Sequence, residues 1–128
     1  IRAYQDKAAI GQTFGMRLSF DDQHQALFHL PDNPALYHGL GDTHGGAIAT
    51  LLDSAAWFAA AVEYDAWIAT VELSVRLLDQ AKREDLIATG RLVRAGKRLA
   101  TAEAQVHTAS GRLIATAAGT FAVTGVGF

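Results

Sequence analysis

A single carboxylate lies within a long, otherwise uncharged segment of the chain. Residues 46–62 are rich in alanine and leucine, and Asp53 is their only charged member. Asp is a poor helix former and is costly to bury without a partner, so its presence here favours a chemical role over a structural one. A carboxylate can attack an electrophilic carbon or take a proton from water, and the sequence leaves both roles open.

Three side chains share the helical face of Asp53 by their spacing. Thr50, Ser54 and Trp57 lie within about one turn of it and are candidates to contact the carboxylate or a bound substrate. Desolvation in such surroundings raises the pKa of a carboxyl group, whereas attack or proton transfer requires the ionised form. We therefore expect neighbouring polar groups to keep Asp53 charged.

The segment His44-Gly45-Gly46 stands at the start of the expected helix. Glycine lets the backbone approach a ligand closely, and the first amides of a helix lack internal partners and lie at its positive end. When a carbonyl oxygen gains negative charge, one aimed donor lowers the barrier by about 3–4 kcal/mol. We predict that the N–H of Gly45 is such a donor, with Gly46 as a second candidate. A tight turn is the simpler explanation for a Gly-Gly pair, but His44 before it and Asp53 after it favour the chemical one.

The spacing of these groups divides the predicted site between two chains. Gly45 and Asp53 are eight residues apart, which at 1.5 Å per residue separates them by about 12 Å along a helix. A reacting carbonyl carbon must lie about 3 Å from each group, so one chain cannot supply both. We therefore predict an obligate dimer in which Asp53 faces Gly45 of an antiparallel copy of the helix, with two equivalent sites.

Alternating patterns before and after this helix predict strands. Apolar and polar residues alternate over 16–20 and 26–30 around a turn at 21–22, which indicates a β-hairpin. The segment 31–41 holds two prolines and two glycines and is expected to be a loop. Residues 1–12 suit a short helix or arm. Four further strands, joined by hairpins, are predicted at 69–78, 86–95, 99–109 and 112–125.

This order of elements predicts one α+β domain spanning residues 1–128, in which an antiparallel sheet of about six strands wraps around one long central helix. A helix enclosed in this way is buried nearly all round, which explains its lack of polar residues. The other face of such a sheet is exposed unless something covers it, and its edge strands invite pairing with a second chain.

The composition excludes several classes of protein. The chain of 128 residues is 50% hydrophobic and 19% charged with a net charge of −2, which argues against disorder and general nucleic-acid binding. It has no cysteine, so disulfides, thiolate zinc sites and cysteine nucleophiles are excluded. No apolar run reaches the roughly 18 residues of a membrane span, and the first residues do not resemble a targeting peptide. We expect a cytoplasmic enzyme that binds neither a membrane nor a nucleic acid.

Residues 41–53, GDTHGGAIATLLD, resemble a motif of the hotdog-fold thioesterases, specifically of their phenylacetate-pathway (PaaI-like) branch. The most specific part is Gly-x-x-His-Gly-Gly with an acidic residue nine positions after the histidine. The segments 70–81 and 90–121 resemble further strands of the family, so the resemblance covers most of the chain. It implies hydrolysis of acyl-CoA thioesters without a metal or an organic cofactor, by dimers or dimers of dimers with active sites between subunits.

The resemblance also implies roles for individual residues. Gly45 corresponds to the amide that polarises the thioester carbonyl, Asp53 to the nucleophile or general base, and His44 to a histidine that orients the turn by hydrogen bonds. Two positions depart from the family pattern. His38 stands where many members have Asn, and Trp57 stands where some have a hydroxyl. We expect His38 either to bind the substrate carbonyl or the attacking water, or to pack within its loop.

Basic residues are expected near the mouth of the site, because coenzyme A carries phosphates. Arg94, Lys97 and Arg98 surround a predicted turn. They are the preferred candidates, since the resemblance places coenzyme contacts in this region, and a solubilising hairpin tip is the alternative.

The spacing of His38, Asp42 and His44 also fits metal ligation. The glycines of this loop give the three side chains no rigid platform, so no metal site is predicted.

Two other functions and the identity of the acyl group stay open. A hotdog dehydratase or hydratase would move protons at the β-carbon of an acyl thioester, although the His-Gly-Gly motif with Asp53 disfavours it. A non-catalytic acyl-CoA-binding protein would gain nothing from a buried carboxylate near an anionic ligand. Trp57, Phe58, Tyr64 and Trp67 either shape a pocket for an aryl or medium-chain acyl group or belong to the core.

Overall fold

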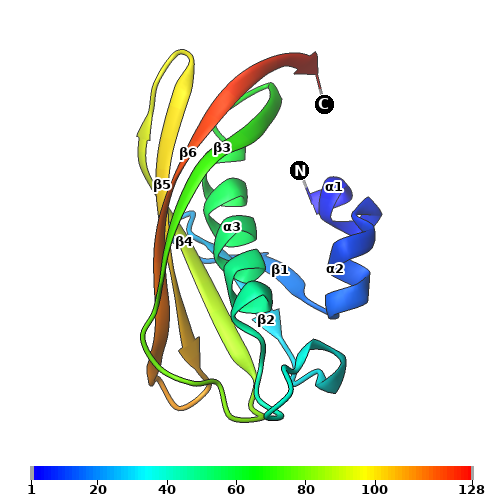
Figure 1. Cartoon of the computed structure of the whole chain (residues 1–128). Coiled ribbons are helices and arrows are strands. Elements are labelled where there is room, and N and C mark those ends of the chain that lie inside the picture. The colour runs from blue at the N-terminus through cyan, green and yellow to red at the C-terminus, as the bar shows by residue number, and fades with distance from the viewer. Residues whose placement is uncertain (1, 128) are drawn as a thin grey trace.

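The computed structural model describes residues 2–127, apart from the side chains of residues 2, 3 and 6. A long helix, α3 (Gly45–Ala61), lies across one face of a six-stranded antiparallel sheet (Figure 1). The strand order is β1-β2-β4-β5-β6-β3. The predicted α+β architecture, a sheet wrapped around one long helix, is confirmed. The strands are β1 (Arg17–Phe20), β2 (Ala26–Leu30), β3 (Ala66–Leu77), β4 (Leu86–Ala95), β5 (Leu99–Thr108) and β6 (Leu113–Gly127).

Small residues on the inner face of the sheet let it approach α3 closely. The buried residues of β4, β5 and β6 include many alanines, and Gly90 of β4 lies directly against the helix. A Cβ atom at Gly90 would overlap the carbonyl oxygen of Ala55. Glycine is therefore required at this close approach, and the contact fixes the height at which α3 lies above the sheet.

One stripe of α3 stays accessible in the single chain. The prediction that the helix is buried nearly all round is wrong along this stripe, because the sheet covers only the opposite side. All residues of the helix outside this stripe are buried. The α3 stripe, half-buried to exposed, consists of Gly45, Gly46, Ala49, Thr50, Asp53 and Ser54.

Strand β3 forms one edge of the sheet and pairs with β6, whereas β4 pairs with β2 and β5. The prediction of a hairpin between β3 and β4 is therefore wrong, although the other predicted hairpins are confirmed. Residues 78–85 connect the two strands. This connection is longer than a tight hairpin turn, so the chain can pass the ends of β6 and β5 before it enters β4. Within residues 2–127 the outer edge of β3 is unpaired, and Val71 and Leu77 are exposed on this strand.

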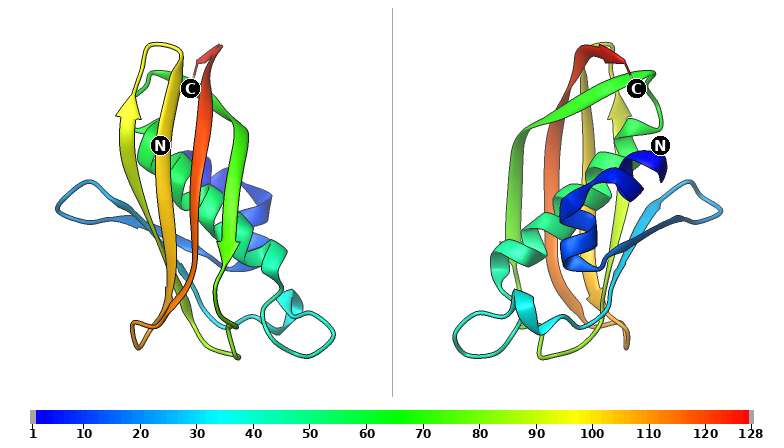
Figure 2. Two further views of the ribbon diagram at one scale, coloured as in Figure 1. Left: turned by 60° about the vertical axis from the view of Figure 1, so that its left-hand side comes forward. Right: turned by 90° about the vertical axis from the view of Figure 1, so that its right-hand side faces the viewer.

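Two short helices, α1 (Arg2–Lys7) and α2 (Ala9–Phe14), precede the sheet. They lie beside α3 on the side away from the sheet (Figure 2). Tyr4 packs against Trp67 with ring centroids 5.6 Å apart, and Gln5 is buried against Gly11. The predicted short helix within residues 1–12 is thus two helices, with residue 1 outside the described part. No helix among the described residues is long and apolar enough to cross a membrane.

Candidate functional site

Asp53 lies in the middle of α3, half-buried, and receives one side-chain hydrogen bond. The hydroxyl of Thr70 on β3 donates to Asp53 Oδ1 at 2.9 Å. Burial raises the pKa of Asp53 above its usual value, and the hydrogen bond from Thr70 opposes this shift without cancelling it. The polar neighbour that hydrogen-bonds to Asp53 is thus a residue that the sequence did not single out.

Thr70 reaches Asp53 because of an irregularity in β3. The register with β6 shifts between Thr70 and Glu72, which leaves Val71 as an extra residue in the strand. A bulge of this kind changes which side chains face the core. The alternating pattern of the sequence marks a strand here, but it does not locate a bulge, so it gave no signal that the Thr70 side chain faces Asp53.

The carboxylate of Asp53 lines an apolar groove of about 380 Å³. Ser54 and Trp57, two of the three predicted neighbours, line the same groove. The third, Thr50, does not line it, and its hydroxyl donates to the carbonyl of Gly46 at 3.0 Å. The groove is also lined from the N-terminal helices, a contribution that the sequence did not reveal.

Trp57 is held firmly beside Asp53. Its indole N–H donates to the carbonyl oxygen of Ile68 at 2.8 Å, and its ring packs against Phe58 and Trp67 with centroids 4.8 and 4.7 Å away. Of the four aromatic residues that the sequence left between pocket and core, Trp57 and Phe58 are buried and also line the groove, Trp67 lines it while partly exposed, and Tyr64 does not line it. The hydroxyl group that contacts Asp53 belongs to Thr70, which approaches from β3.

The start of α3 leaves one amide without a protein acceptor. His44 caps the helix, since its Nδ1 accepts the N–H of Gly46 at 2.8 Å. The N–H of Gly46 is therefore already engaged, whereas that of Gly45 has no acceptor among the described residues. A Cβ at Gly45 would lie 2.7 Å from Leu77 Cδ1, so glycine suits this close approach. Of the two predicted donors, Gly45 is the one that remains available.

Gly45 lines a second hollow, of about 350 Å³, which His38 and Asp42 also line. The backbone N–H of His38 donates to the carbonyl of Asp42 at 2.9 Å, and His38 Nδ1 accepts the N–H of Leu40 at 3.0 Å. The structure therefore brings His38 and Gly45 together. It places Asp53 in a different hollow, farther along the same helix.

The motif His38-Asp42-His44 does not assemble as a ligand set. Nδ1 of His44 is used for the helix cap, and Nδ1 of His38 for the loop. Within the described part of the chain, no group of three or more His, Cys, Asp or Glu side chains is placed to hold a metal ion.

Arg94, Lys97 and Arg98 lie at the turn between β4 and β5, exposed to solvent. Figure 1 shows this turn at the opposite end of the molecule from the start of α3. The three residues line neither the groove of Asp53 nor the hollow of Gly45.

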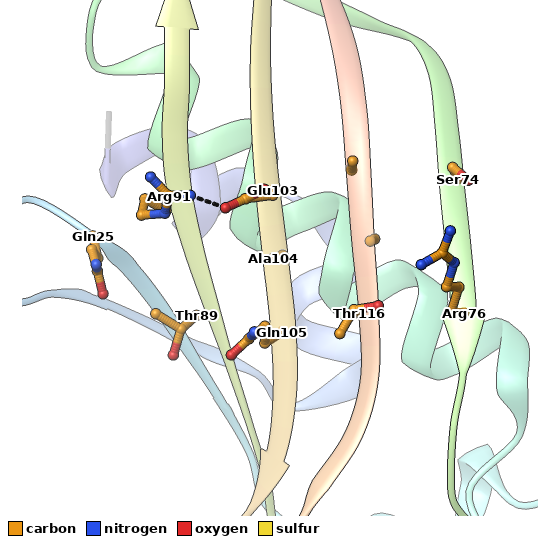
Figure 3. Close-up of a pocket in the computed structure, with 11 residues that line it drawn as sticks. Gln25, Ser74, Arg76, Thr89, Arg91, Glu103, Ala104, Gln105 and Thr116 are labelled. Atoms are coloured by element: carbon orange, nitrogen blue, oxygen red, sulfur yellow. Dashed lines mark hydrogen bonds and ion pairs between the residues drawn. The ribbon is translucent and has the colours of Figure 1, made fainter.

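A third hollow, of about 420 Å³, lies on the outer face of the sheet (Figure 3). Most of the side chains that line it are polar, and Arg91 of β4 forms an ion pair with Glu103 on the neighbouring β5. This hollow faces away from α3, so it is separate from both parts of the candidate site.

Comparisons with known proteins agree with this geometry. The thioesterase superfamily is matched by residues 40–115. A Halobacterium salinarum protein that carries the name "putative esterase" is 32% identical over 115 residues, which cover 84% of this chain and 76% of that protein. These two findings support a thioesterase-type function.

Solved structures show the same fold at lower sequence identity. The PaaI protein of the phenylacetic acid degradation operon of E. coli is 17% identical, with a TM-score of 0.90 over 98% of this chain and 91% of that chain. A Bacillus halodurans protein solved with CoA is 22% identical, with a TM-score of 0.85 over 96% of this chain and 85% of that chain. The predicted hotdog fold is thereby confirmed. Because the superfamily match covers more than half of the chain and includes both the His44-Gly45-Gly46 motif and Asp53, this protein belongs to the thioesterase superfamily.

Proposed function

We propose that this chain hydrolyses acyl-CoA thioesters to a free acid and CoA, and that it does so as a homodimer. Asp53 of one subunit and the N–H of Gly45 of the other act on the same thioester carbonyl. The α3 stripe carries this proposal, since it presents both groups to solvent in two separate hollows. Their separation of eight positions corresponds to about 12 Å of helix, which is too far for one carbonyl group to contact both groups of one chain.

The edge strand β3 offers a way to bring two α3 stripes together. Its outer edge is unpaired among the described residues, and Val71 and Leu77 are exposed along it. Such an edge pairs readily with a copy of itself. A two-fold axis through antiparallel β3 strands would set the two α3 helices antiparallel and side by side, with the Gly45 end of each near Asp53 of the other.

The chemistry follows from the two groups. The Asp53 carboxylate either attacks the carbonyl carbon or removes a proton from a water molecule that attacks it. In both cases the carbonyl oxygen becomes negative, and the partner's Gly45 N–H stabilises that charge. Collapse of the tetrahedral intermediate expels the CoA thiolate, and if Asp53 was the nucleophile, water then hydrolyses the acyl-enzyme anhydride.

The remaining predicted residues take supporting roles in this proposal. His44 holds the turn through its cap on Gly46, and this keeps the Gly45 amide in place. His38 shares the hollow of Gly45 and is proposed to bind the thioester carbonyl or the attacking water. Ser54 lies next to Asp53 in the groove and is proposed to contact the acyl group. Thr50 is proposed to act only through the helix, because its hydroxyl is engaged with a backbone carbonyl.

The phosphates of CoA are proposed to bind Arg94, Lys97 and Arg98. These three exposed cations lie together at the β4-β5 turn, and no described carboxylate lies within ion-pair distance of them. Guanidinium and ammonium groups of this kind suit phosphate oxygens. Binding of CoA by the B. halodurans protein of the same fold supports the choice of ligand.

Subunit mixing tests the shared site directly. One subunit carries Asp53→Asn, and the other carries Gly45→Pro together with Leu77→Ala, which removes the carbon that a Cβ at residue 45 would meet. Each is expected to be nearly inactive, because the first lacks the carboxylate and the second the N–H. After equal mixing and exchange, half of the dimers carry one intact site, so about a quarter of wild-type activity should return. A site contained within one chain predicts no recovery.

A panel of acyl-CoA thioesters tests the reaction itself. Thiol release from at least one of them is expected, and it should depend on Asp53. Binding of acyl-CoA without thiol release from any member of the panel would refute the hydrolase proposal and leave a binding protein or a hydratase. In a single turnover in ¹⁸O-water, a first acid product without ¹⁸O would identify Asp53 as the nucleophile, with water opening the anhydride at the Asp53 carbonyl carbon. A labelled first product is expected for general-base catalysis, and also for an anhydride that water opens at the acyl carbon.

A further inference from the structure

The N-terminal helices form one wall of the groove that holds Asp53. Tyr4 of α1 and Ile10 of α2 line it on one side, while Trp57 of α3 and Trp67 of β3 line it on the other. Met16, which follows α2, is buried and also lines the groove. Figure 2 shows both N-terminal helices lying along α3 on the side away from the sheet. The groove is therefore bounded by segments from both halves of the chain.

The chemistry of this groove is almost entirely apolar. Among the described residues that line it, Asp53 is the only charged one, and none is Lys, Arg or His. Uncharged polar groups come from Tyr4, Gln5, Ser54 and Thr70, and the hydroxyl of Thr70 is already bound to Asp53. An acyl group that carried its own carboxylate would enter without a cationic partner and close to a second negative charge, which is strongly unfavourable.

Three contacts define the shape of the groove. The Tyr4 ring packs on Trp67, with centroids 5.6 Å apart, and this contact connects α1 to β3 across the groove. The buried amide of Gln5 fills the space that the missing side chain of Gly11 leaves on α2, so the two N-terminal helices pack closely on each other. Trp57 is fixed by its hydrogen bond to Ile68. These contacts limit how far the groove can widen.

We infer that α1 and α2 are the selectivity element of this enzyme, and that the groove they close accepts an uncharged, apolar acyl group and rejects an acyl group bearing a carboxylate. This inference rests on the proposed function, because it takes the groove beside Asp53 as the place of the acyl group. It adds the class of that group and assigns its selection to Tyr4 and Ile10.

One charge introduced at the groove tests the selectivity. Ile10 is half exposed, so Ile10→Lys should fold, and its ammonium group would face an incoming carboxylate. The ratio of kcat/KM for glutaryl-CoA to kcat/KM for octanoyl-CoA should rise by about tenfold or more in this variant. The matched control is Thr13→Lys, an equal charge at an exposed position of the same helix that does not line the groove. The control should leave the ratio unchanged.

The size of the groove is tested at Tyr4. Tyr4→Ala removes the contact with Trp67 and should raise kcat/KM for dodecanoyl-CoA relative to phenylacetyl-CoA by several-fold. Binding of the matching non-hydrolysable acyl-CoA thioethers gives a second readout that does not require turnover. The thioether affinities should change in the same direction as the kinetic ratios.

The possible outcomes separate this inference from the proposed function. Unchanged ratios in both variants, with wild-type hydrolysis intact, would overturn the inference and leave the proposed function standing. An equal loss for all substrates together with a weaker dimer would mean that a partner subunit fills the groove, and would also overturn it. Absence of hydrolysis by the wild type, with thioether selectivity as expected, would instead refute the proposed function.

Discussion

The proposed role of the Gly45 amide can be tested with two substitutions that differ in the presence of one N–H group. Gly45→Ala keeps the N–H, whereas Gly45→Pro removes it. Either new Cβ would lie 2.7 Å from Leu77 Cδ1, which is 0.7 Å inside the 3.4 Å at which ordinary contact begins. Both substitutions are therefore made together with Leu77→Ala, which removes that carbon. Proline suits the first residue of a helix, and the extended ψ of 139° at His44 suits a residue before proline.

The expected difference between the two double variants is large. Loss of one donor to a developing oxyanion lowers kcat by about 10²- to 10³-fold, or about 3–4 kcal/mol. Gly45→Pro with Leu77→Ala should show this loss, whereas Gly45→Ala with Leu77→Ala should stay within a few-fold of Leu77→Ala alone. The assay is thiol release from a saturating acyl-CoA, accompanied by thermal melts to verify that all three variants fold and by sedimentation to verify that they dimerise. Nearly equal kcat values for the proline and alanine variants would refute the role of the amide.

Five further predictions concern the same site and its support. Asp53→Asn should lower kcat by several orders of magnitude with little change in substrate affinity, and unchanged turnover would assign catalysis to another residue. Because the proposed reaction requires an ionised Asp53 and burial raises its pKa, wild-type kcat/KM should fall with decreasing pH at a higher pH than for an exposed carboxylate. Thr70→Val removes the hydrogen bond that opposes this shift, so the acidic limb of the pH profile should move to still higher pH. A profile that does not move would show that Thr70 does not act on Asp53. His44→Ala removes the helix cap and should cost about 1 kcal/mol in the free energy of unfolding, whereas a Gly90→Ala change should cost about 1–3 kcal/mol or more by overpacking against α3. Denaturant titration measures the free energy of unfolding of both variants. An unaltered midpoint would contradict the helix cap in the case of His44→Ala, and the close packing of β4 on α3 in the case of Gly90→Ala.

Local patterns in the sequence predicted most of the secondary structure. The helix expected at 46–62 is α3, at Gly45–Ala61, and the six expected strands lie within a few residues of their predicted places. Helical periodicity and strand alternation are properties of neighbouring residues, so they can be read directly from the chain. Which strands pair is decided by contacts between distant residues. For this reason the position of β3 beside β6, rather than beside β4, was not predicted.

The sequence by itself identified Gly45 and Asp53 as the candidate pair, and it determined their separation along the helix. Helix geometry converts eight residues into about 12 Å whatever the surrounding fold, and that distance already argues for a site shared between chains. The tertiary structure alone decided the surroundings of these two groups. Thr70 meets Asp53 because of a bulge in an edge strand, and Tyr4 and Ile10 reach the groove because α1 and α2 pack on α3. These contacts join segments that are distant in the sequence, and their formation depends on the packing of the whole domain.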